Sequence, residues 1–338
     1  MNKENIDNEK QLKLLVLFVF HTINNRVHNF FNNCIFDDDN IDFIIIANGK
    51  HNINNIPKNI YDKKNVITFI RDNIGYDFQG WSEALITNNL YENYDNFIFL
   101  NSSVMGPYME SYGGYKWTDI YINGLNYNNI KLFGSTINTG CNQGTTNPLS
   151  MSHVQSYIFS MDKTTLKYLI NCKIFSINNN ANTYKEAIHN KEILMSRKII
   201  ENNWNIGSLM SYYKDVDFTF NDKKPEDYNI SFLDDIMWNR FRNNIWTNDE
   251  LVFIKGNRCQ INKYNDIFGD PVPFKEKNLI LEYIDKDLKH INKSFKENEM
   301  IVCDNIETIK NAKYGFEKTY IDVKQELEKY IINKNIIL

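Results

Sequence analysis

The sequence predicts an α/β fold with a mainly parallel sheet, and two segments carry most of that prediction. Residues 97–108 read FIFLNSSVMGPY, an apolar run that stops abruptly at Asn101, Ser102 and Ser103. Residues 71–81 read RDNIGYDFQGW and follow another apolar run, NVITFI. Open α/β sheets bind ligands where polar and glycine-rich segments leave the carboxyl ends of successive strands. The chain is therefore predicted to be a nucleotide-binding type of α/β protein with a polar cleft.

Strand and helix patterns alternate along the first part of the chain. Continuous apolar runs, which are typical of strands buried on both faces, predict strands at 13–21, 42–50, 65–70 and 96–100. Apolar residues at helical spacing predict helices at 25–36 and 78–94. This order predicts a βαβαβ array.

The pattern becomes less regular after this array. We expect strands at 130–137 and 153–162, and helices at 163–172, 184–203 and 231–246. Asp162 is expected to cap the first of these helices. From about residue 276 the chain is charged and helical in spacing, with a short strand at MIVCD. We therefore expect one α/β domain over residues 1–275 and a mostly helical extension over residues 276–338.

Composition and charge exclude several classes of protein. The 338 residues can bury a substantial core, and a net charge of −4 with both signs interspersed predicts no nucleic-acid partner. The five cysteines are scattered without a CxxC pair, which favours reduced thiols over a disulfide framework or a zinc site. No apolar run is long enough to cross a bilayer, and the amino terminus lacks the apolar region of a signal peptide. A soluble, cytoplasmic protein without a transmembrane segment is expected.

Several catalytic motifs are absent from the sequence. It contains no GxSxG elbow, no GxxxxGK[ST] loop, no HExxH pair and no GxGxxG after the first strand. These absences argue against an α/β-hydrolase, a P-loop NTPase, a zinc hydrolase and a standard dinucleotide enzyme.

Three polar features each allow a functional and a structural interpretation. Asn101, Ser102 and Ser103 either contact a ligand or form an ordinary turn after a strand. Asp77 either accepts hydrogen bonds from a ribose or base, or caps the helix that follows. Glu192 either acts as a general base or lies on a solvated helix face.

Several linked segments, in order, resemble a GT-A-type glycosyltransferase family related to rhamnan-synthesis (rhamnosyltransferase-like) proteins. They are NIGYDFQGW (73–81), FIFLNSSVMGP (97–107), KLFGSTI (131–137), HVQSYIFSMD (153–162), EILMS (192–196) and ELVFIKGNR (250–258). The resemblance spans roughly residues 13–260. It implies a GT-A-like fold, in which a single Rossmann-type mixed sheet is flanked by helices, together with the helical carboxyl-terminal extension expected above.

The resemblance also implies a donor site. Asn73 and Asp77 would contact the nucleotide, and Asn101 and Ser103 would occupy the position of the Asp-any-Asp motif that holds a divalent cation in such enzymes. Amide and hydroxyl oxygens can coordinate a cation but add no charge. Mg²⁺ or Mn²⁺ bound together with the nucleotide diphosphate is therefore the candidate cofactor, and no residue is assigned as its ligand.

On the acceptor side, the resemblance implies that His153 and Gln155 line the site. Glu192 would be the general base of an inverting reaction, and Glu201 is the alternative base. The expected function is transfer of a sugar from a nucleotide-activated donor to a hydroxyl of a glycan or glycoprotein. The alternative is a catalytically degenerate protein of the same fold that binds glycan or nucleotide without turnover. A third possibility, a nucleotidyltransferase, would need an acidic metal pair that the sequence does not display.

Overall fold

The computed structural model describes residues 12–49, 56–139, 151–234, 236–237, 239–257, 278–285, 288–296, 306–316 and 319–325. The chain divides into two compact units, residues 1–259 and 260–338, and each is described by itself. The boundary predicted after residue 275 lies outside the described residues.

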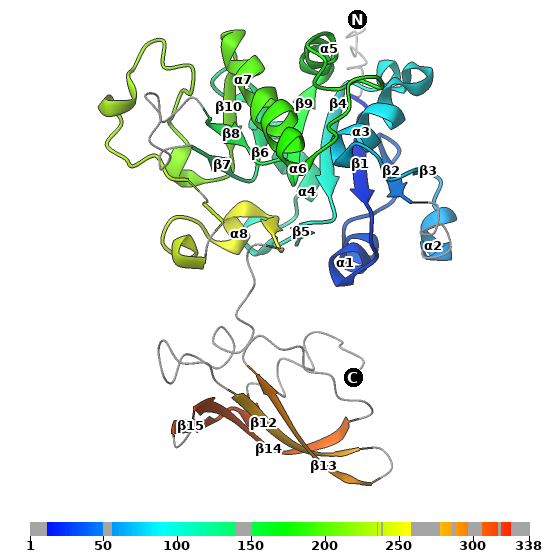
Figure 1. Cartoon of the computed structure of the whole chain (residues 1–338), viewed down its shortest axis with the longest axis vertical. Coiled ribbons are helices and arrows are strands. Elements are labelled where there is room, and N and C mark those ends of the chain that lie inside the picture. Colours follow the sequence, from blue (N-terminus) through cyan, green and yellow to red (C-terminus); the bar gives the residue numbers. More distant parts are fainter. Residues whose placement is uncertain are drawn as a thin grey trace, which may run out of the picture. The chain divides into compact units, whose positions relative to one another are not determined.

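In the described part of the first unit, a seven-stranded mixed sheet forms the centre (Figure 1), with the strand order β10-β6-β9-β4-β1-β2-β3. The strands from β3 to β4 run parallel, as the alternating pattern predicts, and β9 runs antiparallel to its neighbours β4 and β6. The strands of this sheet are β1 (Leu14–Phe20), β2 (Ile41–Asn48), β3 (Val66–Arg71), β4 (Asn96–Asn101), β6 (Ile130–Gly134), β9 (Ile158–Asp162) and β10 (Asn205–Ser208). Two small antiparallel pairs accompany it: β5 (Val104–Met105) with β11 (Ile254–Lys255), and β7 (Ile137–Asn138) with β8 (His153–Val154).

Helices connect these strands. They are α1 (Asn25–Asn33), α2 (Lys58–Tyr61), α3 (Tyr76–Ile86), α4 (Trp117–Asn123), α5 (Lys163–Asn171), α6 (Tyr184–Glu186), the π-helical segment η5 (Ala187–Ile193), α7 (Leu194–Glu201) and α8 (Asn248–Leu251). Short 3₁₀ segments are η2 (Thr87–Asn93), η3 (Glu110–Tyr112), η4 (Gly124–Asn126), η6 (Ser211–Tyr213), η7 (Pro225–Asp227) and η8 (Asn239–Phe241).

Local capping sets two of the helix starts. Asn24 accepts hydrogen bonds from the first turn of α1, and Asp162 caps α5 as predicted, through Thr165 N.

The core lies on both faces of the sheet because strand side chains alternate. Within β1, Leu15, Leu17 and Val19 belong to a cluster with α3, α5 and α7. The intervening residues belong to a second cluster with α1, α2 and α4. Since every residue of β1 is buried, its sequence reads as a continuous apolar run.

The strand predicted over residues 153–162 is wrong as a single element. It divides into β8, which pairs with β7, and β9, which belongs to the main sheet. Between them the backbone turns, since Gln155 N donates to Thr136 O and Ser156 N donates to Glu192 Oε1 instead of joining a ladder.

The helix predicted over residues 231–246 is also wrong. The described residues there contain only η8 as a helical segment. Side chains replace the helical hydrogen-bond ladder: Ile236 N donates to Asn138 Oδ1, and Trp246 Nε1 donates to Ile236 O. Apolar residues at helical spacing are therefore buried one by one in an irregular segment.

In the second unit, the described residues form a four-stranded antiparallel sheet in the order β13-β12-β14-β15, instead of the predicted helices. The strands are β12 (Asn278–Asp285), β13 (His290–Lys296), β14 (Ile306–Phe316) and β15 (Thr319–Asp322). The reason is that buried and exposed residues alternate along β12. Leu279, Leu281 and Tyr283 are buried on one face, while the residues between them are more exposed. The strand expected at MIVCD lies outside the described residues.

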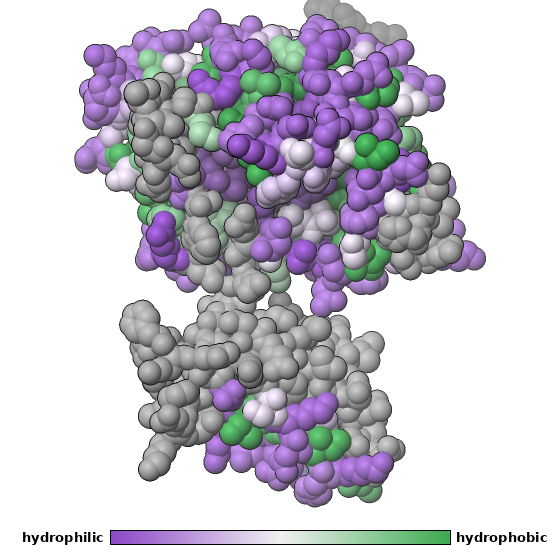
Figure 2. Space-filling model, viewed as in Figure 1, coloured by the Kyte–Doolittle hydropathy of each residue, from purple (hydrophilic) through white to green (hydrophobic). Residues whose placement is uncertain are grey.

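On the face shown in Figure 2, the described surface of the first unit is mostly hydrophilic, and hydrophobic residues are scattered over it. No helix among the described residues is long and apolar enough to cross a membrane.

Candidate functional site

The carboxyl ends of the parallel strands meet at one edge of the sheet. In Figure 1 the arrowheads of β1 and β4 point toward this edge, where β5 and α8 also lie. Asn48, Arg71 and Asn101 are the last residues of β2, β3 and β4. This is the edge at which the sequence predicts a ligand site.

Asp77 and Asn101 meet directly at this edge. Asn101 Nδ2 donates to Asp77 Oδ2 over 2.9 Å, and Asn101 Oδ1 accepts from Ser103 N over 2.9 Å. Asp77 is the second residue of α3, and Gly75, with φ of 73°, is the residue before the helix. Asp77 is therefore not the N-cap residue, and its carboxylate is directed to the end of β4.

Glu192 comes to the same edge from a distant part of the chain. It is buried in η5, and its Oε1 accepts a hydrogen bond from Ser156 N over 2.8 Å. Because the Glu192 side chain itself is buried, it does not lie on a solvated helix face. The charge of Glu192 acts on Asp77 and raises the pKa of that carboxyl.

The pKa of the Asp77 carboxyl is raised from 3.8 to about 6, and burial is the largest cause of this shift. The hydrogen bond from Asn101 opposes this shift, the negative charge of Glu192 adds to it, and the positive charge of Lys255 opposes it. The influence of its charge on Asp77 adds Lys255 to the residues at this edge of the sheet. We call Asp77, Asn101, Ser103, Glu192 and Lys255 the carboxyl-end site.

Lys255 was not singled out by the sequence. It is half-buried in β11, opposite Val104 of β5, and the next residue, Gly256, donates its N–H to Ser103 O over 2.7 Å. The available signal was the segment ELVFIKGNR, which belongs to the family resemblance but is separated by about 150 residues from the Asn-Ser-Ser segment. Only the folded chain pairs the two.

A buried lysine holds the segment that carries Glu192. Lys191 Nζ donates to Lys173 O over 3.0 Å and to Ile174 O over 2.8 Å. Burial lowers the pKa of Lys191 to about 8. Single π-helical turns change the register of a helix and are frequent at functional sites, and this one lies directly before α7.

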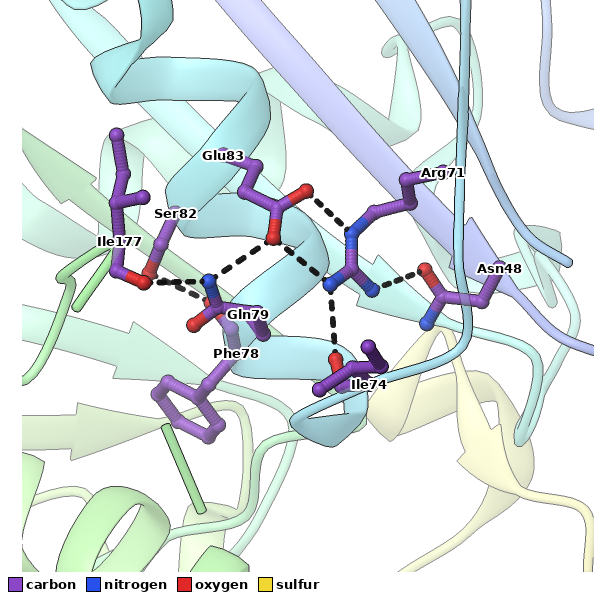
Figure 3. A network of polar contacts seen from close by, with 8 residues as sticks. All are labelled: Asn48, Arg71, Ile74, Phe78, Gln79, Ser82, Glu83 and Ile177. Atoms are coloured by element: carbon purple, nitrogen blue, oxygen red, sulfur yellow. Dashed lines mark hydrogen bonds and ion pairs between the residues drawn. The ribbon is translucent and has the colours of Figure 1, made fainter. Parts of the chain in front are cut away.

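Figure 3 shows a second polar network, which fixes the start of α3. Arg71 binds Glu83 through two hydrogen bonds, Nε to Oε2 over 2.7 Å and Nη2 to Oε1 over 2.9 Å. The same guanidinium donates to Asn48 Oδ1 over 2.9 Å and to Ile74 O over 2.8 Å. Gln79 Nε2 donates to Glu83 Oε1 over 2.9 Å. The hydrogen bonds from Arg71 lower the pKa of Glu83. The network joins β2, β3 and α3, so it positions the turn before Asp77.

The other predicted donor and acceptor residues occupy varied positions. Asn73 is exposed in the turn before α3. His153 is buried in β8 with Nδ1 2.7 Å from Met151 O, and buried Gln155 accepts through Oε1 from Thr136 Oγ1 over 2.8 Å. Gln155 therefore fixes the turn whose next residue binds Glu192.

Glu201, the alternative base, lies at the end of α7, roughly 13 Å further along the helical axis than Glu192. Its side chain is 52% exposed and forms an ion pair with Lys198 over 2.7 Å. Trp81, in the same helix as Asp77, is fully buried in the core, against Phe99 and Phe159.

The donor set does not fit a metal ion held by the protein alone. The amide of Asn101 donates to Asp77 through its nitrogen, and its oxygen already accepts from Ser103 N. Within the described residues, no group of three or more His, Cys, Asp or Glu side chains could hold a metal ion. Hard divalent cations prefer several oxygen ligands, usually with carboxylates among them.

Comparison with known families gives a match over the central part of the chain. The model of a family described as rhamnan synthesis protein F matches residues 43–233, which is more than half of the chain. This match confirms the resemblance found in the sequence motifs. A search of curated proteins gives no match.

Among solved structures, several give partial matches at low identity. A mannosyltransferase from Pyrobaculum calidifontis, solved with GDP-Man and Mn²⁺, has a TM-score of 0.38 at 8% identity, over 59% of this chain and 55% of that chain. A cytidylyltransferase from Leptospira borgpetersenii has a TM-score of 0.34 at 15% identity, over 63% of this chain and 79% of that chain. A glycosyltransferase from Streptococcus pneumoniae has a TM-score of 0.30 at 11% identity, over 60% of this chain and 46% of that chain. At these scores the likeness says nothing about the ligands of this chain.

Proposed function

The chain belongs to the rhamnan synthesis protein F family, and on that premise we propose that it transfers a sugar from a nucleotide-activated donor to a hydroxyl of a glycan or glycoprotein. The observation that carries this proposal is the placement of two carboxylates near the end of β4: Asp77 accepts a hydrogen bond from Asn101, and the charge of Glu192 acts on Asp77. The two carboxylates come from distant segments of the chain. Placing two negative charges close together lowers the stability of the folded state. Such clusters occur most often at functional sites.

The proposed chemistry uses Glu192 as the general base. Glu192 accepts the proton of the acceptor hydroxyl, whose oxygen forms a bond to the anomeric carbon of the donor sugar. The bond between that carbon and the diphosphate oxygen breaks, and its electron pair leaves with the diphosphate. The reaction therefore inverts the anomeric centre. Burial and the hydrogen bond from Ser156 N hold one oxygen of Glu192 in place. A fixed carboxylate supports this role, because such a step depends on a positioned base.

The remaining predicted residues receive roles within this proposal. Asp77, Asn101 and Ser103 hold the donor, and exposed Asn73 contacts its nucleotide from the turn before α3. His153 and Gln155 act on the acceptor side by positioning the turn that binds Glu192, since both are buried. A divalent ion, where one takes part, enters with the diphosphate, and no step is assigned to it.

A second candidate function is binding of a nucleotide or glycan without turnover. The neutral amide of Asn101 favours it, because the family resemblance implies an acidic metal motif at this position and the amide there donates to Asp77 instead. The two candidates differ in turnover alone.

One experiment tests both. A panel of nucleotide sugars is screened by thermal shift, because a ligand that binds the native state raises its apparent stability, and each hit is assayed for release of nucleoside diphosphate. Stabilisation by a nucleotide sugar together with release supports the transferase. Stabilisation without release, in the presence of a range of glycan acceptors, supports the binding protein. If no member of the panel stabilises the chain, the proposed function is wrong.

A further inference from the structure

We propose that Lys255 and Arg26 bind the diphosphate of the donor and stabilise its charge as it leaves, in the place of a metal ion held by acidic residues. This inference rests on the proposed function. It names the residues that compensate for the neutral Asn-Ser-Ser segment.

The backbone brings both cations to that segment. Arg26 Nε donates to Ser102 O over 2.9 Å, and Gly256 N donates to Ser103 O over 2.7 Å. Lys255 is thus one residue from a direct bond to the turn after β4. The two cations reach the turn from α1 and from β11, on chain segments that the fold brings together.

Gly256 permits this close approach. A Cβ atom built on it would lie 2.9 Å from Arg26 Cδ and 2.9 Å from Met105 Cβ, which real Cβ atoms rarely tolerate. A larger residue would separate the Arg26 side chain from β11. The glycine therefore keeps the stem of Arg26 against the segment that carries Lys255.

Neither cation is neutralised by a hydrogen-bonded carboxylate within the described residues. Lys255 is half-buried, and in that part of the chain its electrostatic partner is Asp77, with no ion pair or hydrogen bond formed by its amino group. Arg26 is half-buried too, and in the same described ranges it uses its Nε while forming no ion pair. Half-buried cations of this kind have been partly removed from water, and they bind an anion more strongly than exposed ones do.

The change in charge during the reaction defines the role of Lys255 and Arg26. As the bond between the anomeric carbon and the diphosphate oxygen breaks, negative charge grows on the departing diphosphate, near Asp77 and Glu192, which are themselves acidic. An ammonium and a guanidinium next to the diphosphate oppose that charge, which is the role that preorganised cations play in group transfer. Arg is also suited to bidentate contact with phosphate oxygens.

Isothermal titration tests the inference in buffer that contains EDTA. The probes are UDP, GDP, dTDP and CDP, each compared with its monophosphate. The wild-type protein is expected to bind one diphosphate more tightly than its monophosphate without a metal ion. Lys255→Gln and Arg26→Gln should each weaken diphosphate binding about 10- to 100-fold, as expected when one charged hydrogen bond is lost, while the binding of the monophosphate changes far less.

Two further variants serve as controls. Lys255→Arg keeps the charge and should retain most of the affinity. Lys131→Gln removes a half-buried lysine at the opposite end of the sheet, near the start of β6, and should bind as the wild type does. Thermal unfolding of every variant establishes that it is folded, and Lys255→Arg and Arg26→Gln remain informative if Lys255→Gln is not.

The outcomes separate the inference from the function on which it rests. The inference is wrong if the wild-type protein prefers a diphosphate only when Mg²⁺ or Mn²⁺ is added, and if folded Lys255→Gln and Arg26→Gln bind it as the wild type does. The proposed transferase function would still stand. Failure of the wild-type protein to bind any of the nucleotides, with or without metal ion, overturns both.

Discussion

The side chain of Asn101 donates a hydrogen bond to the carboxylate of Asp77 over 2.9 Å, and this bond joins the last residue of β4 to the first turn of α3. A buried strand end is thereby attached to a helix start that the Arg71 network also holds. The bond limits how far the carboxylate can move, and it gives Asp77 its acceptor role in the absence of ligand.

The raised pKa of Asp77 predicts that this residue costs stability at neutral pH. Its carboxyl titrates near pH 6 when folded and near 3.8 when unfolded, so the folded state binds more protons across that window. The free energy of unfolding therefore falls as pH rises from about 4 to about 7. Asp77→Asn, which keeps an acceptor for Asn101, should be more stable than the wild type at pH 7.5 by on the order of 1–3 kcal/mol. The advantage should nearly vanish at pH 4.

Urea unfolding at both pH values measures this difference. Asp222→Asn, a change at an exposed aspartate, is the matched control and should show no such dependence. An advantage of Asp77→Asn that is equal at pH 4 and pH 7.5 would contradict the assignment of the raised pKa.

Asp77 should also matter for the donor. Asp77→Ala is expected to remain folded and to bind the donor nucleotide more weakly by about 1.5–3 kcal/mol, because a charged hydrogen bond to the ligand is lost. Isothermal titration with the nucleotide that the screen identifies measures the change. Unchanged affinity in a folded variant would remove Asp77 from the donor site.

Glu192 is expected to act in the chemical step. Glu192→Gln keeps the shape of the side chain and removes proton acceptance, so turnover should fall roughly 10²- to 10⁴-fold. Donor affinity should change little, because only an interaction of the transition state is lost. Steady-state kinetics and titration in the same variant separate these effects.

The matched control is Glu201→Gln, since Glu201 is exposed and paired with Lys198. That variant should keep nearly the turnover of the wild type. The reverse result, a large loss at Glu201 and a small one at Glu192, would move the base to α7.

Removing one partner of the Arg71–Glu83 ion pair should destabilise the fold. The Arg71 side chain is 5% exposed and that of Glu83 is 27% exposed. Removing one partner of a buried pair leaves an unpaired charge, so Arg71→Ala should cost about 3 kcal/mol. In the double variant with Glu83→Ala, the loss should be smaller than the sum of the two single losses. Urea unfolding of the four proteins measures this coupling, and strictly additive losses would show that the pair contributes nothing of its own.

The two compact units predict independent folding. A fragment ending at residue 259 contains the whole carboxyl-end site, including Lys255. It should unfold cooperatively and bind the nucleotide with the affinity of the full chain, because residues 260–338 belong to the other unit. A fragment that is folded but does not bind would show that the second unit completes the site.

The parallel half of the sheet could be predicted because its sequence leaves little choice. In β1 and β4, residues on both faces are buried, so each strand is a continuous apolar run with polar residues at its end. Because Asn101 is the polar residue that ends the apolar run of β4, it could be predicted to lie at the carboxyl edge of the sheet. The contact of Asn101 with Asp77 depends on where α3 lies, and no local pattern encodes that.

The helices expected after residue 276 are wrong because charged residues at helical spacing also fit a strand exposed on one face, and other features were missed because they depend on contacts between distant segments. In β12, Leu279, Leu281 and Tyr283 carry the period of two, and Ile280 between them hides it. The π-helical turn before α7 depends on Lys191 reaching the carbonyls of Lys173 and Ile174, a contact between segments. Lys255 was likewise missed because only the pairing of β11 with β5 brings it to the site.

The contact between Asn101 and Asp77 also restricts how this chain could evolve. An Asn101→Asp change would replace the donor with a second carboxylate at hydrogen-bond distance from Asp77, with Glu192 already acting on it. Like charges so close cannot both ionise without a cation between them. An Asn101→Asp change is therefore harmful as a first substitution unless the partner at position 77 changes as well. Such epistasis would keep a lineage with an amide at this position committed to it.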